Sequence, residues 1–291
     1  MRTLVLGGSG MLGRAVVAEA RRRGWAALGL SREQGDVRDG GRMRYWMEAF
    51  RPEVAVNCAA FTRVDACESA REQAIAVNGE AVGEVVRAAA RAGARLVHVS
   101  TDYVFDGEAR LPYREEAPTG PRSVYGQSKL DGERRALAAR DSLVVRTSWL
   151  FGPGGPNFVA TIVGLIERGT RPLRVVDDQV GAPTYTPFLA RALLDLARLG
   201  ARGVVHYRNG GPVSWYAFAA AIARLWASGP REPAGSVEVV PVKSTEYPRP
   251  APRPAYSVLD VERCELLLGR PVEPWEWGLA EYLSGLRAGR G

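Results

Sequence analysis

The stretch that decides the fold is Gly7-Gly8-Ser9-Gly10-Met11-Leu12-Gly13, which follows the apolar segment Thr3–Leu6 and opens a helical pattern over Leu12–Arg23. In the first strand-to-helix turn of a dinucleotide-binding fold, glycines let the backbone turn tightly and approach a pyrophosphate, and the helix N-terminus supplies oriented N–H groups. The spacing Gly7-x-x-Gly10-x-x-Gly13 differs from the G-x-G-x-x-G form, but its place between a strand and a helix is typical of cofactor binding.

Outward from this loop, short runs rich in Val and Leu alternate with helical patterns. The runs are Thr3–Leu6, Ala26–Leu30, Val54–Asn57, Leu96–Ser100 and Leu143–Arg146, and the helical segments include Leu12–Arg23, Ala74–Ala92 and Ser123–Ala139. This alternation predicts an α/β fold with a Rossmann-like doubly wound parallel sheet, covered by helices on both faces.

After about Phe151 the pattern becomes irregular and richer in proline. We therefore expect an NAD(P)-binding Rossmann domain over residues 1–150, to which later elements at about 186–210 return. One of these is a strand expected at Val204–Tyr207. Residues 151–291 are expected to form mainly a smaller, mixed α/β substrate-binding domain.

Composition argues against several other classes of protein. The net charge is +7, but no basic run is longer than Arg21-Arg22-Arg23 at the end of the first predicted helix, so we expect no nucleic-acid partner. Three cysteines and two histidines lack metal-ligand spacing, which argues against a Cys/His metal site and fits a reducing cytoplasm. We expect no secretory signal, because the chain goes from Met1-Arg2-Thr3 directly into an apolar strand that ends in glycines. We expect no membrane span, because the longest uncharged run, 147–166, contains helix-breaking prolines and glycines.

One lysine stands out in a chain in which almost every basic residue is arginine. Of 39 basic residues only Lys129 and Lys243 are lysines, and Lys129 stands four positions after Tyr125. On a helix, which Ser123 could cap, these two side chains share a face, so the ammonium and the phenol would enter one cleft. A nearby positive charge lowers the pKa of a phenol, and guanidinium cannot replace the compact ammonium. We expect Tyr125 to act as a proton donor or acceptor.

Further polar residues follow the carboxyl ends of predicted strands, the edge at which doubly wound folds bind ligands. The fourth strand ends in Ser100–Gly107, where Thr101 offers a second hydroxyl to orient a substrate oxygen. The second strand runs into Ser31-Arg32 instead of an acidic residue that would bind the ribose of NAD, so Arg32 could hold the 2′-phosphate of NADP. Asp36-Val37 could contact the adenine. We expect NADPH as the cofactor and leave NADH open.

Taken together, these segments resemble the extended short-chain dehydrogenase/reductase superfamily and, within it, the dTDP-4-dehydrorhamnose reductase family. The resemblance covers essentially the whole chain and is carried by six blocks in order: Asn57–Glu68, Ser100–Gly107, Tyr125–Lys129, Arg146–Trp149, Asp178–Thr184 and Arg253–Leu259. It implies NAD(P)H-dependent reduction of the C4 ketone of dTDP-4-dehydro-L-rhamnose to dTDP-L-rhamnose, a step that serves cell-wall polysaccharide.

The resemblance also implies roles for single residues. Tyr125 would protonate the C4 alkoxide, Lys129 would hold the nicotinamide ribose and lower the pKa of the phenol, and Thr101 would hydrogen-bond the same oxygen. Motif and resemblance together give as cofactor-binding residues Gly7, Gly10, Met11, Leu12, Gly13, Ser31, Arg32, Asp36, Val37, Ala59, Ala60, Phe61, Thr62, Tyr125 and Lys129. The expected substrate-binding residues are Thr62, Val64, Thr101, Asp102, Tyr103, Tyr125, Trp149 and Arg253.

Alternatives stay open for several of these side chains. Trp149 could be a core aromatic, and Asp178–Thr184 could shape the second domain without touching a ligand. Arg253 could pair with an acidic side chain, although an Arg-Pro segment also suits a fork presented rigidly to a diphosphate. Some members of the family bridge a dimer through a metal held by glutamates. Since the corresponding stretch here reads Gly13-Arg14-Ala15, we expect no metal, and a homodimer stays open.

Other functions within and beyond the superfamily also stay open. Nucleotide-sugar 4,6-dehydratases carry a glutamate where this chain has Tyr103, so ketone reduction fits better than elimination. Another nucleotide-sugar 4-reductase or epimerase remains an alternative. A different class is a non-catalytic NADP-binding regulatory subunit resembling that of methionine adenosyltransferase, against which the intact Thr101, Tyr125 and Lys129 argue.

Overall fold

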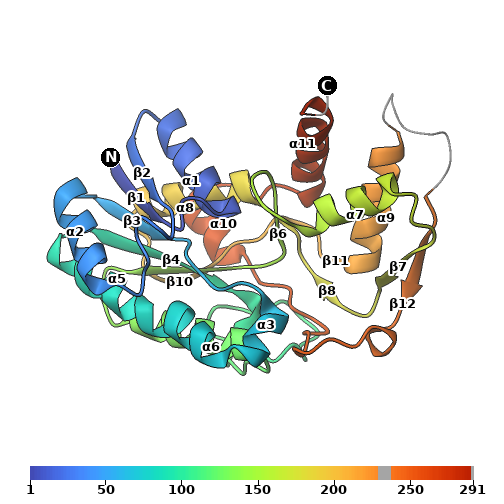
Figure 1. Cartoon of the computed structure of the whole chain (residues 1–291), viewed down its shortest axis with the longest axis horizontal. Coiled ribbons are helices and arrows are strands. Elements are labelled where there is room, and N and C mark those ends of the chain that lie inside the picture. The colour runs from blue at the N-terminus through green and yellow to red at the C-terminus, as the bar shows by residue number, and fades with distance from the viewer. Residues whose placement is uncertain (229–236, 290–291) are drawn as a thin grey trace.

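One six-stranded parallel sheet organises the molecule. The computed structural model describes residues 1–228 and 237–289. The strand order is β2-β1-β3-β4-β5-β10, with all neighbours parallel (Figure 1). The strands are β1 Arg2–Leu6, β2 Ala26–Leu30, β3 Val54–Asn57, β4 Arg95–Thr101, β5 Leu143–Thr147 and β10 Gly203–His206. The doubly wound fold class is confirmed, and each predicted strand is found with its ends shifted by at most one residue.

Helices cover both faces of this sheet, as the apolar strands require. One face carries α1 Met11–Arg22, α8 Thr186–Arg198 and α10 Glu262–Leu268; the other carries α2 Gly40–Phe50, α5 Ala81–Arg91 and α6 Val124–Leu137 (Figure 1). Successive residues of β5 show why both faces need cover. Leu143 and Val145 pack in the core beneath α1 and α8, whereas Val144 packs in the core beneath α2 and α5.

The predicted helix Ala74–Ala92 is interrupted. Two short helices, α3 Val64–Ser69 and α4 Arg71–Ile75, are followed by a π-helical turn, η1 Ala76–Glu80, that leads into α5. The turn places Asn78 inside, where its Oδ1 accepts from the Phe61 amide and its Nδ2 donates to the Phe61 carbonyl and the Ser128 hydroxyl. The interruption therefore fixes the segment after β3 against α6.

The C-terminal region consists of helices and short strand pairs at one end of the sheet (Figure 1). Strand β7 pairs with β12, β8 with β11, and β6 with β9. Their bounds are β6 Leu150–Phe151, β7 Leu173–Val176, β8 Val180–Gly181, β9 Thr184–Tyr185, β11 Val213–Ser214 and β12 Val239–Val242. The helices are α7 Phe158–Glu167, α9 Trp215–Ala227 and α11 Trp275–Ala288, and two 3-10 turns are η2 Asp102–Val104 and η3 Ser244–Glu246.

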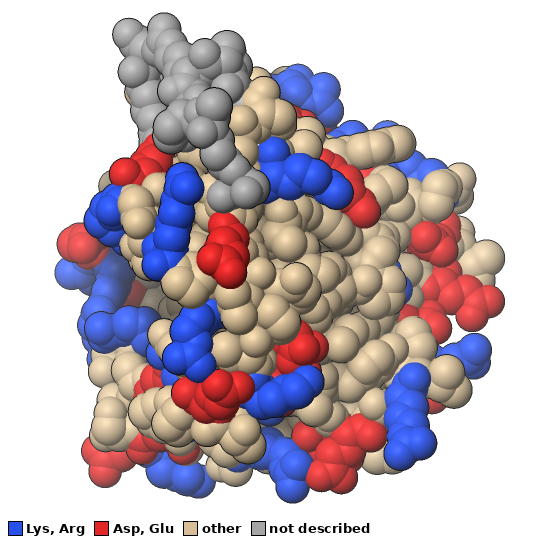
Figure 2. Space-filling model, turned by 90° about the vertical axis from the view of Figure 1, so that its right-hand side faces the viewer, with Lys and Arg blue, Asp and Glu red and all other residues tan. Residues whose placement is uncertain are grey.

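The surface of this C-terminal region carries charges of both signs. Figure 2 shows Lys and Arg interspersed with Asp and Glu around uncharged residues, so the face in view has no field of one sign. Within residues 1–228 and 237–289, no helix has the length and apolar character needed to cross a membrane.

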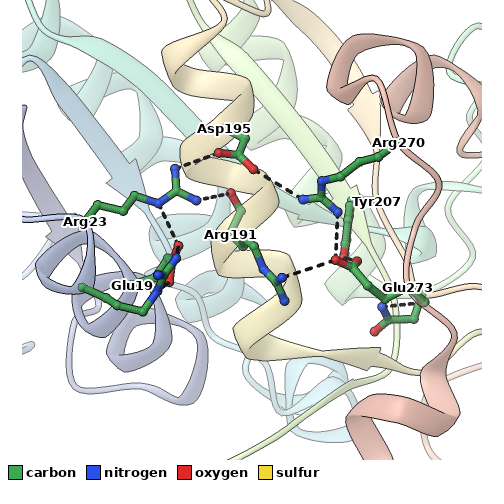
Figure 3. A network of polar contacts seen from close by, with 9 residues as sticks. Glu19, Arg23, Arg191, Asp195, Tyr207, Arg270 and Glu273 are labelled. Atoms are coloured by element: carbon green, nitrogen blue, oxygen red, sulfur yellow. Dashed lines mark hydrogen bonds and ion pairs between the residues drawn. The ribbon is translucent and has the colours of Figure 1, made fainter.

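A separate polar network ties the first helix to α8 and to the segment before α11. Asp195 lies between Arg23 and Arg270, at 2.8 and 3.4 Å, and Glu273 accepts from Arg270 at 2.8 Å (Figure 3). Glu19 pairs with Arg23 at 2.7 Å. This paired network, completed by Arg191 and Tyr207, lies on the outer side of α1 and α8 (Figure 3).

Candidate active site

The glycine loop follows β1, which lies between β2 and β3 in the sheet. Gly7 has a φ of 72°, and a Cβ there would lie 2.8 Å from the amide nitrogen of Ala59, so only glycine fits between the two segments. Gly10 precedes α1 without a side-chain cap, and the first turn carries no acidic residue. The N–H groups of this turn are therefore open to an anion, and the loop fits a dinucleotide pyrophosphate.

Two of the expected cofactor residues are buried in the core. Leu12, in the first turn of α1, packs into the core between α1 and the sheet, and Val37 packs with Met43 and Met47 of α2. Their side chains stabilise the fold, so a contact with a cofactor would come from the backbone.

At the end of β2, charged side chains form a small hollow of about 430 Å³. Arg38 binds both carboxylate oxygens of Asp36 and lowers the pKa of that carboxyl to about 2, while Arg32 is exposed and lies 3.7 Å from it. The Ser31 hydroxyl donates to Glu33 at 2.7 Å. Arg38, which was not among the expected site residues, is closer to Asp36 than Arg32 is.

The segment after β3 is held by two buried asparagines. The Ala59 amide donates to Asn57 Oδ1 at 3.1 Å, and Phe61 is held through both backbone groups by Asn78. Ala60 lies between Ala59 and Phe61 in the chain and is half-buried. Thr62 is exposed, and no hydrogen bond among the described residues joins it to the rest of the predicted site.

Tyr125 lies at the start of α6 and points toward the end of β4. Ser123 caps the helix by accepting from the Gly126 amide at 3.1 Å, as predicted. The rings of Tyr103 and Tyr125 pack edge to face, with 5.5 Å between their centroids. Burial raises the pKa of Tyr125 above its ordinary value, and a hydrogen bond with Thr101 opposes this rise. The phenol therefore stays protonated at neutral pH, which suits a proton donor.

Lys129 is buried one turn further along α6. Its Nζ donates to the Val99 carbonyl at 2.6 Å and lies 3.5 Å from His98 Nε2. Burial lowers the pKa of Lys129 to about 8, and the charge of Glu133 opposes this shift. Burial of the phenol dominates the pKa of Tyr125, and the Lys129 ammonium donates to the Val99 carbonyl, so a lowering of the Tyr125 pKa by Lys129 stays a prediction.

Asp102 follows Thr101 at the end of β4 and is also buried. Thr101 Oγ1 donates to Asp102 Oδ1 at 3.0 Å, while Oδ2 has no partner in hydrogen-bond geometry, although Ser257 lies close by. Burial raises the pKa of Asp102 to about 6. The site thus contains a carboxyl that is kept from full solvation.

A cavity of about 660 Å³ extends from this cluster into the C-terminal region. Three expected substrate residues line it, namely Val64, Tyr103 and Arg253. Arg253 Nη2 pairs with Asp65 at 2.9 Å, which was the alternative left open for it, but Nη1 is buried without a partner among the described residues. This nitrogen therefore lacks a partner in hydrogen-bond geometry, although the Tyr103 hydroxyl lies close to the guanidinium.

Trp149 does not line the cavity, unlike the neighbouring Trp215. Its backbone has a φ of 45°, and its ring stacks on Trp215 at 3.4 Å between centroids with 6° between the planes. The other face is closed by Gly181, where a Cβ would lie 2.5 Å from the indole. Gln179 from the same block lines the cavity, whereas Asp178 accepts from Ser244 and supports the loop.

Sequence reasoning missed several polar residues that shape the site. Asn57 and His98 are buried and contact each other at 3.2 Å, and His98 reaches Lys129. A polar residue inside an apolar strand was the signal available for both. Asn78 had no such signal, because the π-helical turn that directs it inward does not follow from periodicity.

The structure brings the glycine loop, the segment after β3 and the pair of Thr101 and Tyr125 to the carboxyl edge of one parallel sheet, where Lys129 is buried on the same helix as Tyr125. This arrangement defines a nucleotide-binding oxidoreductase of the extended short-chain dehydrogenase/reductase class.

Comparison with known proteins specifies the family. A family model described as the RmlD substrate binding domain matches residues 1–288. The chain is 43% identical to a dTDP-4-dehydrorhamnose reductase of Streptomyces griseus, over 99% of this chain and 96% of the relative. It is 40% identical to a probable dTDP-4,6-dihydroxy-2-methyloxan-3-one 4-ketoreductase of Streptomyces antibioticus, over 99% and 96%. A crystal structure of dTDP-4-dehydrorhamnose reductase from Bacillus anthracis in complex with NADP is 31% identical, with a TM-score of 0.91 over 98% of this chain and 99% of that one.

The chain belongs to the RmlD family of dTDP-4-dehydrorhamnose reductases and related ketoreductases. The resemblance inferred from the six sequence blocks is confirmed.

Proposed function

We propose that this chain reduces the C4 ketone of dTDP-4-dehydro-L-rhamnose to dTDP-L-rhamnose, with NADPH as the preferred cofactor and NADH as an alternative. The observation that carries the proposal is the cavity of about 660 Å³ that starts at Tyr103 and Arg253, next to Thr101 and Tyr125. A ketone placed at the inner end of this cavity would lie beside a protonated phenol, and the rest of a sugar nucleotide would extend outward.

The closeness of Tyr125 and Thr101 supports the roles proposed for the catalytic residues. Tyr125 donates its proton to the alkoxide formed at C4, and Thr101 holds the same oxygen by a hydrogen bond. Lys129 would hold the nicotinamide ribose. When bound, the nicotinamide supplies the hydride.

The cofactor itself would be held along the carboxyl edge of the sheet. Gly7–Gly13 would receive the pyrophosphate at the open N-terminus of α1. Ser31, Arg32, Asp36 and Val37 would hold the adenosine end, with Arg38 as a further cation for a 2′-phosphate. Ala59–Thr62 would line the path beyond β3.

The buried Nη1 of Arg253 supports a phosphate contact in the substrate. An unpartnered guanidinium nitrogen beside a cavity is costly unless it binds an anion or acceptor, and a diphosphate satisfies it. Val64, Asp102 and Tyr103 would line the sugar end. Trp149 would act through Trp215, which presents the aromatic surface.

The test is oxidation of NADPH on addition of dTDP-4-dehydro-L-rhamnose, with the product identified by NMR. We expect stoichiometric formation of dTDP-L-rhamnose. Binding of NADPH without turnover would favour the regulatory-subunit alternative, and failure to bind any nicotinamide nucleotide would contradict both.

A second candidate is reduction of another dTDP-linked 4-keto-6-deoxy sugar. It is favoured by the 40% identity with the Streptomyces antibioticus protein, whose name gives a different 4-keto substrate. A comparison of kcat/KM for several dTDP-4-keto sugars decides between the two, since the true substrate should exceed the others by about 100-fold or more.

The division of labour between the two parts of the chain belongs to the same proposal. Residues 1–150, together with elements at about 186–210, would bind the cofactor, and residues 151–291 mainly the substrate. The homodimer and the cytoplasmic location remain predictions, and gel filtration with light scattering would test the first of them.

A further inference from the structure

A histidine buried behind the catalytic helix connects two elements of the site. His98 lies in the middle of β4 with no exposed surface, three residues before Thr101. Its Nδ1 is 3.2 Å from Asn57 Nδ2, and its Nε2 is 3.5 Å from Lys129 Nζ. The imidazole thus spans the gap between the end of β3 and α6.

The neighbours of Asn57 determine which ring nitrogen carries the proton. The Ala59 amide donates to Asn57 Oδ1 at 3.1 Å, so the amide group of Asn57 turns its NH₂ toward His98. Nδ1 must then accept, and a neutral imidazole carries its single proton on Nε2. Burial and the charge of Lys129 lower the pKa of His98 well below its ordinary value, which keeps the ring neutral.

The result is an N–H group that faces an ammonium. Both are donors, so Lys129 cannot donate to the ring and directs its short hydrogen bond of 2.6 Å to the Val99 carbonyl instead. We propose that His98 is a positioning residue for Lys129: Asn57 fixes the proton on His98 Nε2, and because this N–H offers the ammonium no acceptor, Lys129 keeps its hydrogen bond to the Val99 carbonyl in one orientation. The proposal rests on the proposed role of Lys129 in catalysis.

A pH effect follows from this arrangement. The groups that face Lys129 are His98 and the Val99 carbonyl from β4, Cys58 from the segment after β3, and Glu133 one turn later on α6. The pKa of Lys129 is lowered, so its charge is lost as pH rises through about 8. The N–H of His98 disfavours the charge further, and its removal should move this loss to higher pH.

The experiment measures Lys129 directly, because the chain has only two lysines and two histidines. Protein labelled with ¹³C and ¹⁵N in lysine and histidine is titrated by NMR, and Lys243→Arg assigns the second lysine. We expect His98 in the Nε2–H form and a Lys129 midpoint below that of Lys243. In His98→Leu the midpoint should move up, and the alkaline limb of kcat should move with it.

The matched control is His98→Gln, whose amide can present an oxygen to Asn57 and an NH₂ to Lys129, and which should keep the midpoint near that of the unchanged chain. If His98→Leu does not fold, Asn57→Asp provides the test through the tautomer: the carboxylate oxygen that replaces the amide NH₂ accepts from Nδ1 and should shift the proton to it. The added charge raises the Lys129 midpoint as well, so the ¹⁵N shifts of His98 are the readout for this variant. An Nδ1–H form in the unchanged chain, a Lys129 midpoint that ignores His98→Leu, or an Nε2–H form that persists in Asn57→Asp would overturn the proposal. The titration needs no turnover, so a failure of the proposed reaction alone would leave it standing.

Discussion

Two polar clusters of this molecule differ in how completely their charged groups are paired. In the paired network, Glu19, Arg23, Asp195, Arg270 and Glu273 bond to one another across α1, α8 and the segment before α11 (Figure 3). None of its side chains is among the buried polar atoms without a partner in the described residues. Its charged groups satisfy each other, even where they line a cavity of about 590 Å³.

The catalytic cluster is built differently. Among the described residues, Arg253 Nη1 is buried without a partner in hydrogen-bond geometry and Asp102 Oδ2 has only Ser257 close by. Burial shifts the pKa values of Asp102, Tyr125 and Lys129 away from their ordinary values. Unsatisfied groups cost stability and are retained where a ligand or a reaction uses them. The charged groups of the paired network are therefore mutually satisfied, whereas those of the catalytic cluster are only partly satisfied, although unpaired buried hydroxyls also occur elsewhere among the described residues, for example at Thr3 and Thr184. Substitutions in the two clusters should therefore affect different properties.

The largest effect should come from Tyr125→Phe, which removes one oxygen and little volume. Turnover should fall by about 1000-fold or more, because no other group touching the C4 oxygen is placed to donate a proton as readily. NADPH affinity, measured by fluorescence titration, should change little. An unchanged kcat would contradict the assignment of Tyr125 as the proton donor.

Lys129→Arg tests whether the buried ammonium has a chemical role. We expect kcat/KM to fall by about 100-fold, since a guanidinium is too broad for the space beside Val99 and stays charged. Lys243→Arg is the matched control, because Lys243 is exposed and paired with Asp177. Near-normal activity of the Lys129 variant would remove the argument from the rarity of lysine.

Asp102→Asn should separate stability from activity within the site. The folded-state pKa of Asp102, about 6, lies above the ordinary value of 3.8, so folding favours the protonated form and stability falls as pH rises from about 4 to 6. The amide variant lacks this loss. It should be more stable above pH 6, by about 1–3 kcal/mol in urea unfolding, while kcat/KM falls. Equal stability at pH 5 and pH 8 in the unchanged chain would show that Asp102 is not strained.

Asp195→Asn should have the smallest effect and the opposite pattern. It removes the charge shared by Arg23 and Arg270, so the free energy of unfolding should decrease by about 1–2 kcal/mol. The kinetic constants should stay within about twofold of the unchanged chain. A large loss of kcat with intact stability would mean that the paired network contributes to catalysis, and the distinction between the clusters would fail.

Much of the framework could be predicted from the sequence. Short apolar runs that are buried on both faces define the strands, and the glycine loop, the Ser123 cap and the spacing of Tyr125 and Lys129 are local features. The direction of the pKa shift of Tyr125 could not be predicted. The direction of this shift depends on how deeply neighbouring side chains such as Tyr103 bury the phenol. The i,i+4 spacing gives no information about the depth of burial.

Other parts of the site depend on contacts between distant segments. Asp65 meets Arg253, and Trp215 covers Trp149, through packing of parts of the chain that no local pattern relates. The π-helical turn that turns Asn78 inward is a further case, since a helical pattern continues through it. The individual residues assigned to cofactor and substrate remain predictions that ligand-bound structures would test.

The pairing of Asp65 with Arg253 also has a consequence for the order in which the protein is made. Asp65 leaves the ribosome early in synthesis and the strands that follow it in the chain come next. Arg253 emerges only after most of the chain has been translated. The glycine loop and the first five strands can form a sheet before then, whereas the cavity wall near Arg253 is completed near the end of synthesis. A nascent chain can therefore acquire its nucleotide-binding edge before it can hold a sugar substrate.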